Sequence, residues 1–285
     1  MLKKAAIGAV AALGLSVAAA SAQSAPDSGY AAVNGLKMYY EIRGSGQPLV
    51  LLHGGVGAIE MFGPILPALS ASHRVIAVDL QAHGRTADID RPLRVELMAD
   101  DVAALLRQLG IAKADLLGYS LGGGVALQTA IRHPQAVRKL VVVSTPFKRN
   151  GWYPEILAGM AQMGPEAAEP MKQTPMYQLY AAIAPRPQDW PVLLAKIGEA
   201  LKQDYDWSGE VAQLQMPVLI VAGDADAVRT AHLVEFFALL GGGQRDAGWD
   251  GSGRPKAKLA ILPGATHYDI FSRSELASTA LRFLD

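Results

Sequence analysis

Short aliphatic runs alternate with helical patterns along the chain from about residue 30. Six runs are apolar enough for strands that are buried on both faces of a parallel sheet. They cover residues 49–52, 75–78, 114–117, 140–143, 218–221 and 259–262. An earlier run, residues 37–42, indicates an exposed strand that ends at Gly44-Ser45-Gly46. The pattern therefore predicts at least seven short strands.

Helical signals lie between these runs. Gly110 is suited to end a helix, and apolar residues recur at helical spacing before it. They are Val95, Met98, Val102, Leu105 and Leu109. Another helix is predicted from Leu121 and must end before Pro134, because the residue before a proline disfavours helical geometry. Strands that alternate with helices predict an α/β fold, with a mostly parallel sheet covered by helices on both faces.

Two stretches interrupt this alternation. Residues 146–216 contain no clear buried strand and hold eight of the 17 prolines, which divide helices into short pieces. The stretch is rich in methionine and aromatic residues, which is typical of a lid over a cleft, although the same residues also suit a helical subdomain with its own small core. The candidate substrate contacts in it are Trp152, Met160, Met163, Met176 and Tyr177. Residues 241–258, with six glycines, predict a long surface loop whose purpose the sequence does not indicate.

Composition narrows the class of protein. The chain has 285 residues, of which 51% are hydrophobic and 18% charged, as expected of a folded protein with a substantial core. Basic and acidic residues both number 26, so nothing in the charge suggests a nucleic acid or an anionic membrane as a partner. The chain has no cysteine, which excludes disulfides, a thiol nucleophile and a lipoprotein anchor.

The first 22 residues have the layout of a bacterial secretory signal peptide. A short basic start precedes an apolar run of small residues, and Ala20-Ser21-Ala22 fits a cleavage site. We expect cleavage after Ala22, a periplasmic or secreted protein, and no stable membrane association afterwards. The alternative is an uncleaved anchor helix, but the run is only marginally long enough to span a bilayer.

The candidate nucleophile is Ser120, in Gly118-Tyr119-Ser120-Leu121-Gly122. This Gly-x-Ser-x-Gly pattern follows a predicted strand and opens a predicted helix, the setting of a strained turn that exposes a serine. The same glycines also resemble a dinucleotide-binding loop. Such loops normally follow the first strand of a fold, whereas this one follows several, so the position favours the nucleophile.

A serine hydroxyl needs a base to take its proton. The best candidate is His267, which follows the last predicted strand, and the best group to orient it is Asp226, after the strand at residues 218–221. The order Ser120, Asp226, His267 is that of the α/β-hydrolase triad. Asp224 is a rival for Asp226, but it lies closer to the turn and is suited to capping it.

Acyl transfer also needs N–H donors for a developing oxyanion. The candidates are the N–H of Leu121, directly after Ser120, and that of Gly55, in His53-Gly54-Gly55 after another strand. The histidines outside the triad have simpler interpretations. His53 and His83 lie in His-Gly pairs that shape turns, whereas His73, His133 and His232 are expected at helix ends or on the surface. No metal-binding spacing of histidines occurs.

These motifs together resemble the α/β-hydrolase superfamily over nearly the whole predicted mature chain. The matching segments lie at residues 52–55, 79–86, 118–123, 223–226 and 263–267. The resemblance implies an eight-stranded, mostly parallel sheet, a helical cap inserted after the sixth strand, and no cofactor or metal. After the signal peptide predicted at 1–22, it divides the chain into a core at 23–145 and 217–285 and a cap at 146–216. One departure is Gln81-Ala82, where many relatives carry Arg-Gly.

The expected function is therefore that of a serine hydrolase, a carboxylesterase-like enzyme that cleaves small carboxylic esters or lactones through an acyl-enzyme on Ser120. Two alternatives remain open at this stage. The same residues are compatible with hydrolysis of a carbon–carbon bond beside a ketone, or with perhydrolase or haloperoxidase chemistry. The fold also suits a non-catalytic binder of small molecules. The sequence does not indicate an oligomeric state.

Overall fold

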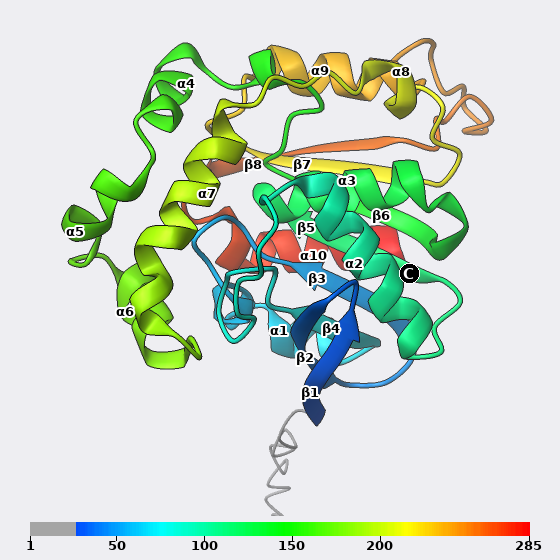
Figure 1. The fold of residues 1–285 in the computed structure, drawn as a ribbon. Helices are drawn as coiled ribbons and strands as arrows, with labels where there is room; N and C mark the ends of the chain where they lie inside the picture. The colour runs from blue at the N-terminus through cyan, green and yellow to red at the C-terminus, as the bar shows by residue number, and fades with distance from the viewer. Residues whose placement is uncertain (1–26) are drawn as a thin grey trace, which may run out of the picture.

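A computed structural model describes residues 27–285, so the predicted signal peptide lies outside the described residues. Eight strands form one sheet in the order β1-β2-β4-β3-β5-β6-β7-β8 (Figure 1). The strands are β1 (Asp27–Val33), β2 (Leu36–Arg43), β3 (Gln47–Leu52), β4 (His73–Val78), β5 (Ala114–Tyr119), β6 (Val137–Val143), β7 (Val218–Ala225) and β8 (Lys258–Thr266). The pairs β1–β2 and β2–β4 are antiparallel, and all other neighbouring strands are parallel. This confirms the predicted mostly parallel sheet.

Alternate residues of the central strands face opposite sides of the sheet. In β3, Val50 and Leu52 belong to one buried cluster, and Leu49 and Leu51 belong to the other. The first cluster is covered by α2 (Val95–Gln108), α3 (Leu121–Arg132) and α9 (Thr230–Leu239). The second is covered by α1 (Leu66–Ser70) and α10 (Ser274–Leu284). Helices therefore cover both faces, which explains why these strands are continuously apolar.

The segment between β6 and β7 is helical and forms the cap. Its helices are α4 (Pro154–Ala161), α5 (Ala168–Met171), α6 (Pro175–Ile183), α7 (Trp190–Lys202) and α8 (Ser208–Val211). Prolines stand in the first turns of α4, α6 and α7, where a missing N–H costs nothing. The helix α7 is longer than the predicted short pieces, because no further proline occurs between Pro191 and Pro217.

The cap has a core of its own and also packs on the sheet domain. Trp190, Leu193 and Leu194 of α7 form a buried cluster that includes Ala82 and Leu93 from the loop after β4. This loop lies at the carboxyl ends of the parallel strands, so the cap stands over that edge of the sheet. In Figure 1, α4 to α7 form a group beside the sheet and away from α2 and α3. This buried cluster fits the interpretation of the cap as a subdomain with its own core, whereas the lid over a cleft stays a prediction.

Residues 241–257 contain no helix or strand and connect α9 to β8, which already begins at Lys258, the last residue of the predicted loop; Trp249 in the loop is fully exposed. Several of its glycines adopt positive φ, among them Gly241 and Gly248. None of the helices in residues 27–285 is long and apolar enough to cross a membrane.

Candidate active site

Ser120 occupies a strained turn between β5 and α3. Its backbone has φ 53° and ψ −117°, a region that costs free energy for a residue with a side chain. The flanking glycines make this turn possible. A Cβ on Gly118 would lie 2.1 Å from the carbonyl oxygen of Gly122, and one on Gly122 would lie 2.1 Å from that of Leu52. The sequence thus places small residues where the strand, the turn and the helix meet.

The three residues of the predicted triad lie together at the carboxyl edge of the sheet. His267, after β8, has its Nε2 3.2 Å from the hydroxyl oxygen of Ser120. Its Nδ1 lies 3.0 Å from Oδ1 of Asp226, which follows β7. The three side chains come from the carboxyl ends of the parallel strands β5, β7 and β8, although up to 147 residues separate them along the chain. The arrangement has the hydroxyl, the imidazole and the carboxylate in hydrogen-bonded series.

Asp226 is nearly buried and surrounded by donors. Its carboxylate accepts hydrogen bonds from the hydroxyl of Ser144 and from the N–H groups of Gly223 and Val228, besides its contact with His267. Burial alone raises the pKa of Asp226, but the hydrogen bonds from His267 and Ser144 outweigh it, and the pKa lies below the ordinary value. The carboxylate is therefore ionised and fixed in place.

The rival Asp224 does not face His267. It is exposed, and its Oδ1 accepts a hydrogen bond of 2.8 Å from the N–H of Gly264. This is the turn-capping role that its position suggested.

The two predicted oxyanion donors lie on neighbouring segments beside Ser120. A Cβ on Gly54 would be 3.5 Å from Cβ of Ser120, and one on Gly55 would be 4.0 Å from the side chain of Leu121. Leu121 is the first residue of α3, where helix N–H groups lack partners within the helix. Ile197 of the cap helix α7 also lies 4.0 Å from that position of Gly55. The glycine loop after β3 therefore lies between the nucleophile and the cap.

The five candidate substrate contacts occupy different environments. Trp152 lies beside the triad, with its ring centroid 5.5 Å from that of His267. Met160 packs on the same core cluster as Trp152. Met163 and Tyr177 pack in the cap's own cluster, and Met176 is exposed. Trp152 is thus the member of the set that the structure brings to the triad, and the substrate-binding role of all five stays a prediction.

Two residues at the site were not among the candidates. Ser144 follows β6 directly, has φ 51° and donates to Asp226. Tyr119 is buried, and its hydroxyl donates a 2.6 Å hydrogen bond to the carbonyl oxygen of His267. A polar residue directly after a strand was the signal that identified Ser120, and it also applies to Ser144. Tyr119 precedes the turn and carries no comparable signal.

The remaining histidines correct part of the sequence interpretation. His73 and His232 were expected at helix ends or on the surface. Both are buried, and only His232 lies at a helix end, in the first turn of α9. His73 starts the inner strand β4, and His232 stacks on Phe147, whose ring centroid is 4.3 Å away. His53 and His83 are completely buried, with ring centroids 5.1 Å apart, and His133 contacts Asp100 at 2.7 Å. Within residues 27–285, no group of three or more possible ligands could hold a metal ion.

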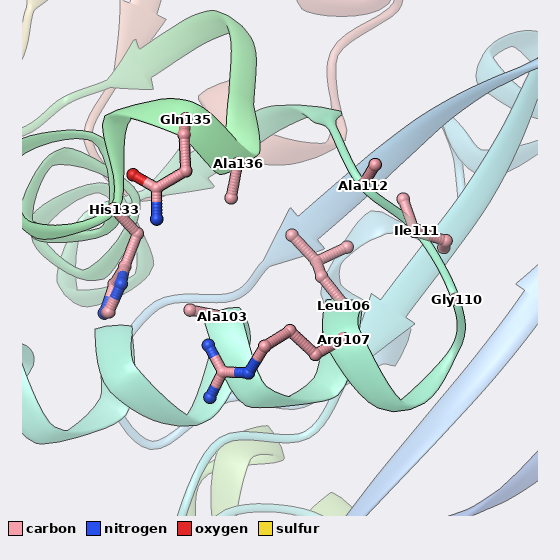
Figure 2. Close-up of a pocket in the computed structure, with 9 residues that line it drawn as sticks. All are labelled: Ala103, Leu106, Arg107, Gly110, Ile111, Ala112, His133, Gln135 and Ala136. Atoms are coloured by element: carbon pink, nitrogen blue, oxygen red, sulfur yellow. The ribbon is translucent and has the colours of Figure 1, made fainter.

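A surface hollow of about 400 Å³ lies elsewhere in the molecule. Figure 2 shows Leu106 and Arg107 of α2 and His133 around it. Its other walls, residues 111–112 and 135–136, directly precede β5 and β6, so the hollow is at the amino edge of the sheet. Ser120 is at the opposite, carboxyl edge. The hollow therefore does not belong to the triad.

Comparisons with known proteins agree with this geometry. The family described as alpha/beta hydrolase fold matches residues 47–185. A pimeloyl-[acyl-carrier protein] methyl ester esterase from Neisseria meningitidis is 31% identical over 251 residues, covering 81% of this chain and 90% of that protein. A 2-hydroxymuconate semialdehyde hydrolase from a Pseudomonas species is 37% identical over 115 residues, covering 39% of this chain and 41% of that protein.

The structure of an enol-lactonase from Burkholderia xenovorans is similar with a TM-score of 0.66 at 23% identity, covering 90% of this chain and 99% of that one. At that identity the likeness concerns the fold. Three findings agree. They are the order of the sheet, the helical insertion after β6, and the esterase relative that matches over most of its length. The chain belongs to the α/β-hydrolase superfamily and is a hydrolytic enzyme of that fold.

Proposed function

We propose that this protein is a serine hydrolase that cleaves small carboxylic esters, cyclic esters included, through an acyl-enzyme on Ser120. The observation that carries the proposal is the hydrogen-bonded series from the Ser120 hydroxyl through His267 to Asp226. The similarity to a methyl ester esterase supports esters as the substrate class.

The first half of the reaction follows from the positions of the groups. The hydroxyl oxygen of Ser120 attacks the ester carbonyl while Nε2 of His267 takes its proton. Asp226 accepts a hydrogen bond from Nδ1, which fixes the imidazole and stabilises its charged form. The N–H groups of Gly55 and Leu121 donate to the oxyanion of the tetrahedral intermediate. His267 then returns the proton to the leaving alkoxide, and the acyl group stays on Ser120.

The second half reverses these roles with water. His267 takes a proton from a water molecule that attacks the acyl ester of Ser120. The second tetrahedral intermediate uses the same two N–H donors, and its collapse releases the carboxylic acid and returns the proton to the Ser120 oxygen. Every proton is thus carried by one imidazole.

The apolar cap suggests that the acyl or aryl group decides substrate preference. Ile197 lies over the Gly55 loop, and Trp152 lies over His267. A series of p-nitrophenyl esters from acetate to decanoate tests this, since kcat/KM is expected to vary by at least about tenfold along it. Equal kcat/KM for all chain lengths would remove the cap from the explanation.

A fluorophosphonate probe tests the nucleophile itself. The purified protein is expected to form a covalent adduct on Ser120, located by mass spectrometry of the peptide, and Ser120→Ala is expected to form none. Hydrolysis of the ester series should disappear with the adduct. A folded protein that neither reacts with the probe nor hydrolyses any ester would contradict the proposal and favour a non-catalytic binder.

The 2-hydroxymuconate semialdehyde hydrolase among the relatives favours a second candidate, hydrolysis of a carbon–carbon bond beside a ketone by the same residues. The same preparation therefore needs a vinylogous diketone beside the esters and lactones. Turnover of the diketone with inert esters would assign the second reaction. Turnover of esters alone would support the first.

A further inference from the structure

We propose that Trp152 is a positioning residue for the triad: its indole, fixed by Tyr205 at the base of the cap, holds the imidazole of His267 in line with Ser120 and Asp226. The inference rests on the proposed serine mechanism and assigns Trp152 a part other than substrate contact. The two rings meet edge to face, with centroids 5.5 Å apart and planes at 76°.

The imidazole needs such a support. Its hydrogen bonds, 3.0 Å to Asp226 and 3.2 Å to Ser120, both lie at ring nitrogens and act in the ring plane. They resist in-plane movement much more than tilting of the ring about the line through the two nitrogens. Tilting is resisted by buried rings packed against the imidazole. Tyr119 supplies one, with centroids 5.3 Å apart and planes at 41°, and Trp152, only 8% exposed, supplies the other at a steeper angle.

Trp152 is itself tied to the loop that carries the acid. Its backbone forms an isolated antiparallel bridge with Val228, and the N–H of Val228 donates to Oδ1 of Asp226 at 3.1 Å. The N–H of the next residue, Tyr153, donates to the carbonyl oxygen of Ala227. The backbone of Trp152 and the carboxylate of Asp226 are therefore fixed by the same few residues.

The indole is tied to the base of the cap. Its Nε1–H donates to the hydroxyl oxygen of Tyr205 at 3.2 Å. Tyr205 is held in turn, because its carbonyl oxygen accepts from the N–H of Arg149 and its ring stacks on Trp207, with centroids 4.4 Å apart. Burial raises the pKa of Tyr205 to about 12, so the phenol stays neutral over the working pH range. A single hydrogen bond thus connects Tyr205, at the base of the cap, to the indole ring that packs against His267.

Tyr268 offers a matched control within the same site. Its ring centroid lies 5.6 Å from that of His267 with planes at 79°, close to the geometry of Trp152. Its side chain, however, is 71% exposed. An exposed ring that water can replace restrains the imidazole little. Trp152 and Tyr268 therefore lie at nearly equal distance from the imidazole and differ in how firmly they are anchored.

The experiment compares steady-state ester hydrolysis in Trp152→Ala, Trp152→Phe and Tyr268→Ala. A small misplacement of a catalytic group costs on the order of 10- to 100-fold in rate, and we expect a loss of this size in the kcat of Trp152→Ala. The loss should be the same for short and long acyl chains, and KM should stay within about threefold of the wild type. Trp152→Phe keeps a ring and should recover most of kcat. Tyr268→Ala should stay within about twofold of the wild type.

Two further measurements separate positioning from a loss of folding. Tyr205→Phe removes only the acceptor of the indole N–H, and it should lower kcat several-fold with KM unchanged while the circular dichroism spectrum stays that of the wild type. The acid limb of the kcat–pH profile should move in Trp152→Ala, because a tilted imidazole loses part of its contact with Asp226. A merely structural defect would lower the amount of active enzyme and leave this limb in place.

The outcomes distinguish this inference from the proposed function. If the wild type neither reacts with a fluorophosphonate nor hydrolyses esters, the serine mechanism itself fails. If the wild type is active and Trp152→Ala raises KM in proportion to acyl length with kcat unchanged, Trp152 is a wall of the substrate pocket and the positioning role is overturned. Equal loss of kcat in Trp152→Ala and Tyr268→Ala would overturn it as well.

Discussion

At the scale of single residues, two aspartates two positions apart have separate tasks. Asp226 collects hydrogen bonds from Ser144, Gly223, Val228 and His267, whereas Asp224 is exposed and accepts from Gly264 at the turn before His267. Asp224 lies near the end of β7 and Asp226 directly follows the strand, and both have the same side-chain chemistry. Their environments alone determine which one can orient an imidazole.

This difference predicts the effect of removing each charge. Asp226→Asn should lower kcat on esters by about 10⁴, because the amide favours the wrong imidazole tautomer while keeping the shape of the side chain. Asp224→Asn keeps an oxygen acceptor for Gly264 and should remain within about threefold of the wild type. Stopped assays of both variants at pH 8 measure the ratio. Comparable losses in the two variants would mean that Asp226 is not the orienting group.

At the scale of elements, the strand–turn–helix around Ser120 leaves no room for added atoms. Gly118 and Gly122 each have a carbonyl oxygen 2.1 Å from where a Cβ would stand. Gly159 in α4 has nothing within 4 Å of that position. The turn therefore requires glycine at positions 118 and 122, whereas α4 has room for a larger residue at position 159.

Gly118→Ala should consequently lower the free energy of unfolding by about 3 kcal/mol or more, since backbone atoms and not a flexible side chain must move. Gly159→Ala should raise it by about 0.5 to 1 kcal/mol, because alanine costs less conformational entropy within a helix. Urea unfolding followed by circular dichroism measures both. The argument about the turn would not survive a Gly118→Ala protein as stable as the wild type.

The same elements show what a sequence can indicate. Strands buried on both faces, such as β3, are continuous aliphatic runs, so their positions were predictable. The edge strand β1 (Asp27–Val33) was missed, because its small and polar residues carry no such run and it depends on pairing with β2. The order of Ser120, Asp226 and His267 was also recognisable. How close these three residues lie in space could not be predicted, because it depends on which strands are neighbours in the sheet.

Other features depend on contacts that no local pattern records. Trp152 and Tyr205 are 53 residues apart and meet through one hydrogen bond. His73 and His232 were expected at helix ends or on the surface from their local sequence, but packing of distant segments buries both. For the same reason, the roles of individual cap residues such as Met163 and Tyr177 could not be assigned from composition.

At the scale of the whole molecule, buried histidines link folding to pH. Burial lowers the pKa of His53 to about 4, that of His83 to about 3 and that of His232 to about 4. The folded protein excludes protons that the unfolded chain binds below about pH 6.5. Asp79 has the opposite effect. Burial raises its pKa to about 6, so its carboxylate binds a proton at a higher pH in the folded protein than in the unfolded chain. Between pH 6.5 and pH 5 the three histidines outweigh Asp79, which leaves a net loss of stability towards acid.

The free energy of unfolding should therefore fall by roughly 2 to 4 kcal/mol between pH 6.5 and pH 5, with little change between pH 7 and pH 8. Urea titrations at these four pH values measure the fall. A constant or higher free energy of unfolding at pH 5 would show that these histidines are protonated in the folded protein.

The two ends of the cap segment lie next to each other, although the cap also packs on the sheet domain through Ala82 and Leu93. The N–H of Trp207 donates a 3.0 Å hydrogen bond to the carbonyl oxygen of Phe147, so the segments that enter and leave the cap lie side by side. Some sixty residues are thus inserted between two points that already touch. Exchanging them for another length of chain leaves the spacing of β6 and β7 unchanged. A laboratory can therefore transplant caps from relatives at this junction to change substrate preference, provided that the graft carries an aromatic residue in place of Trp152.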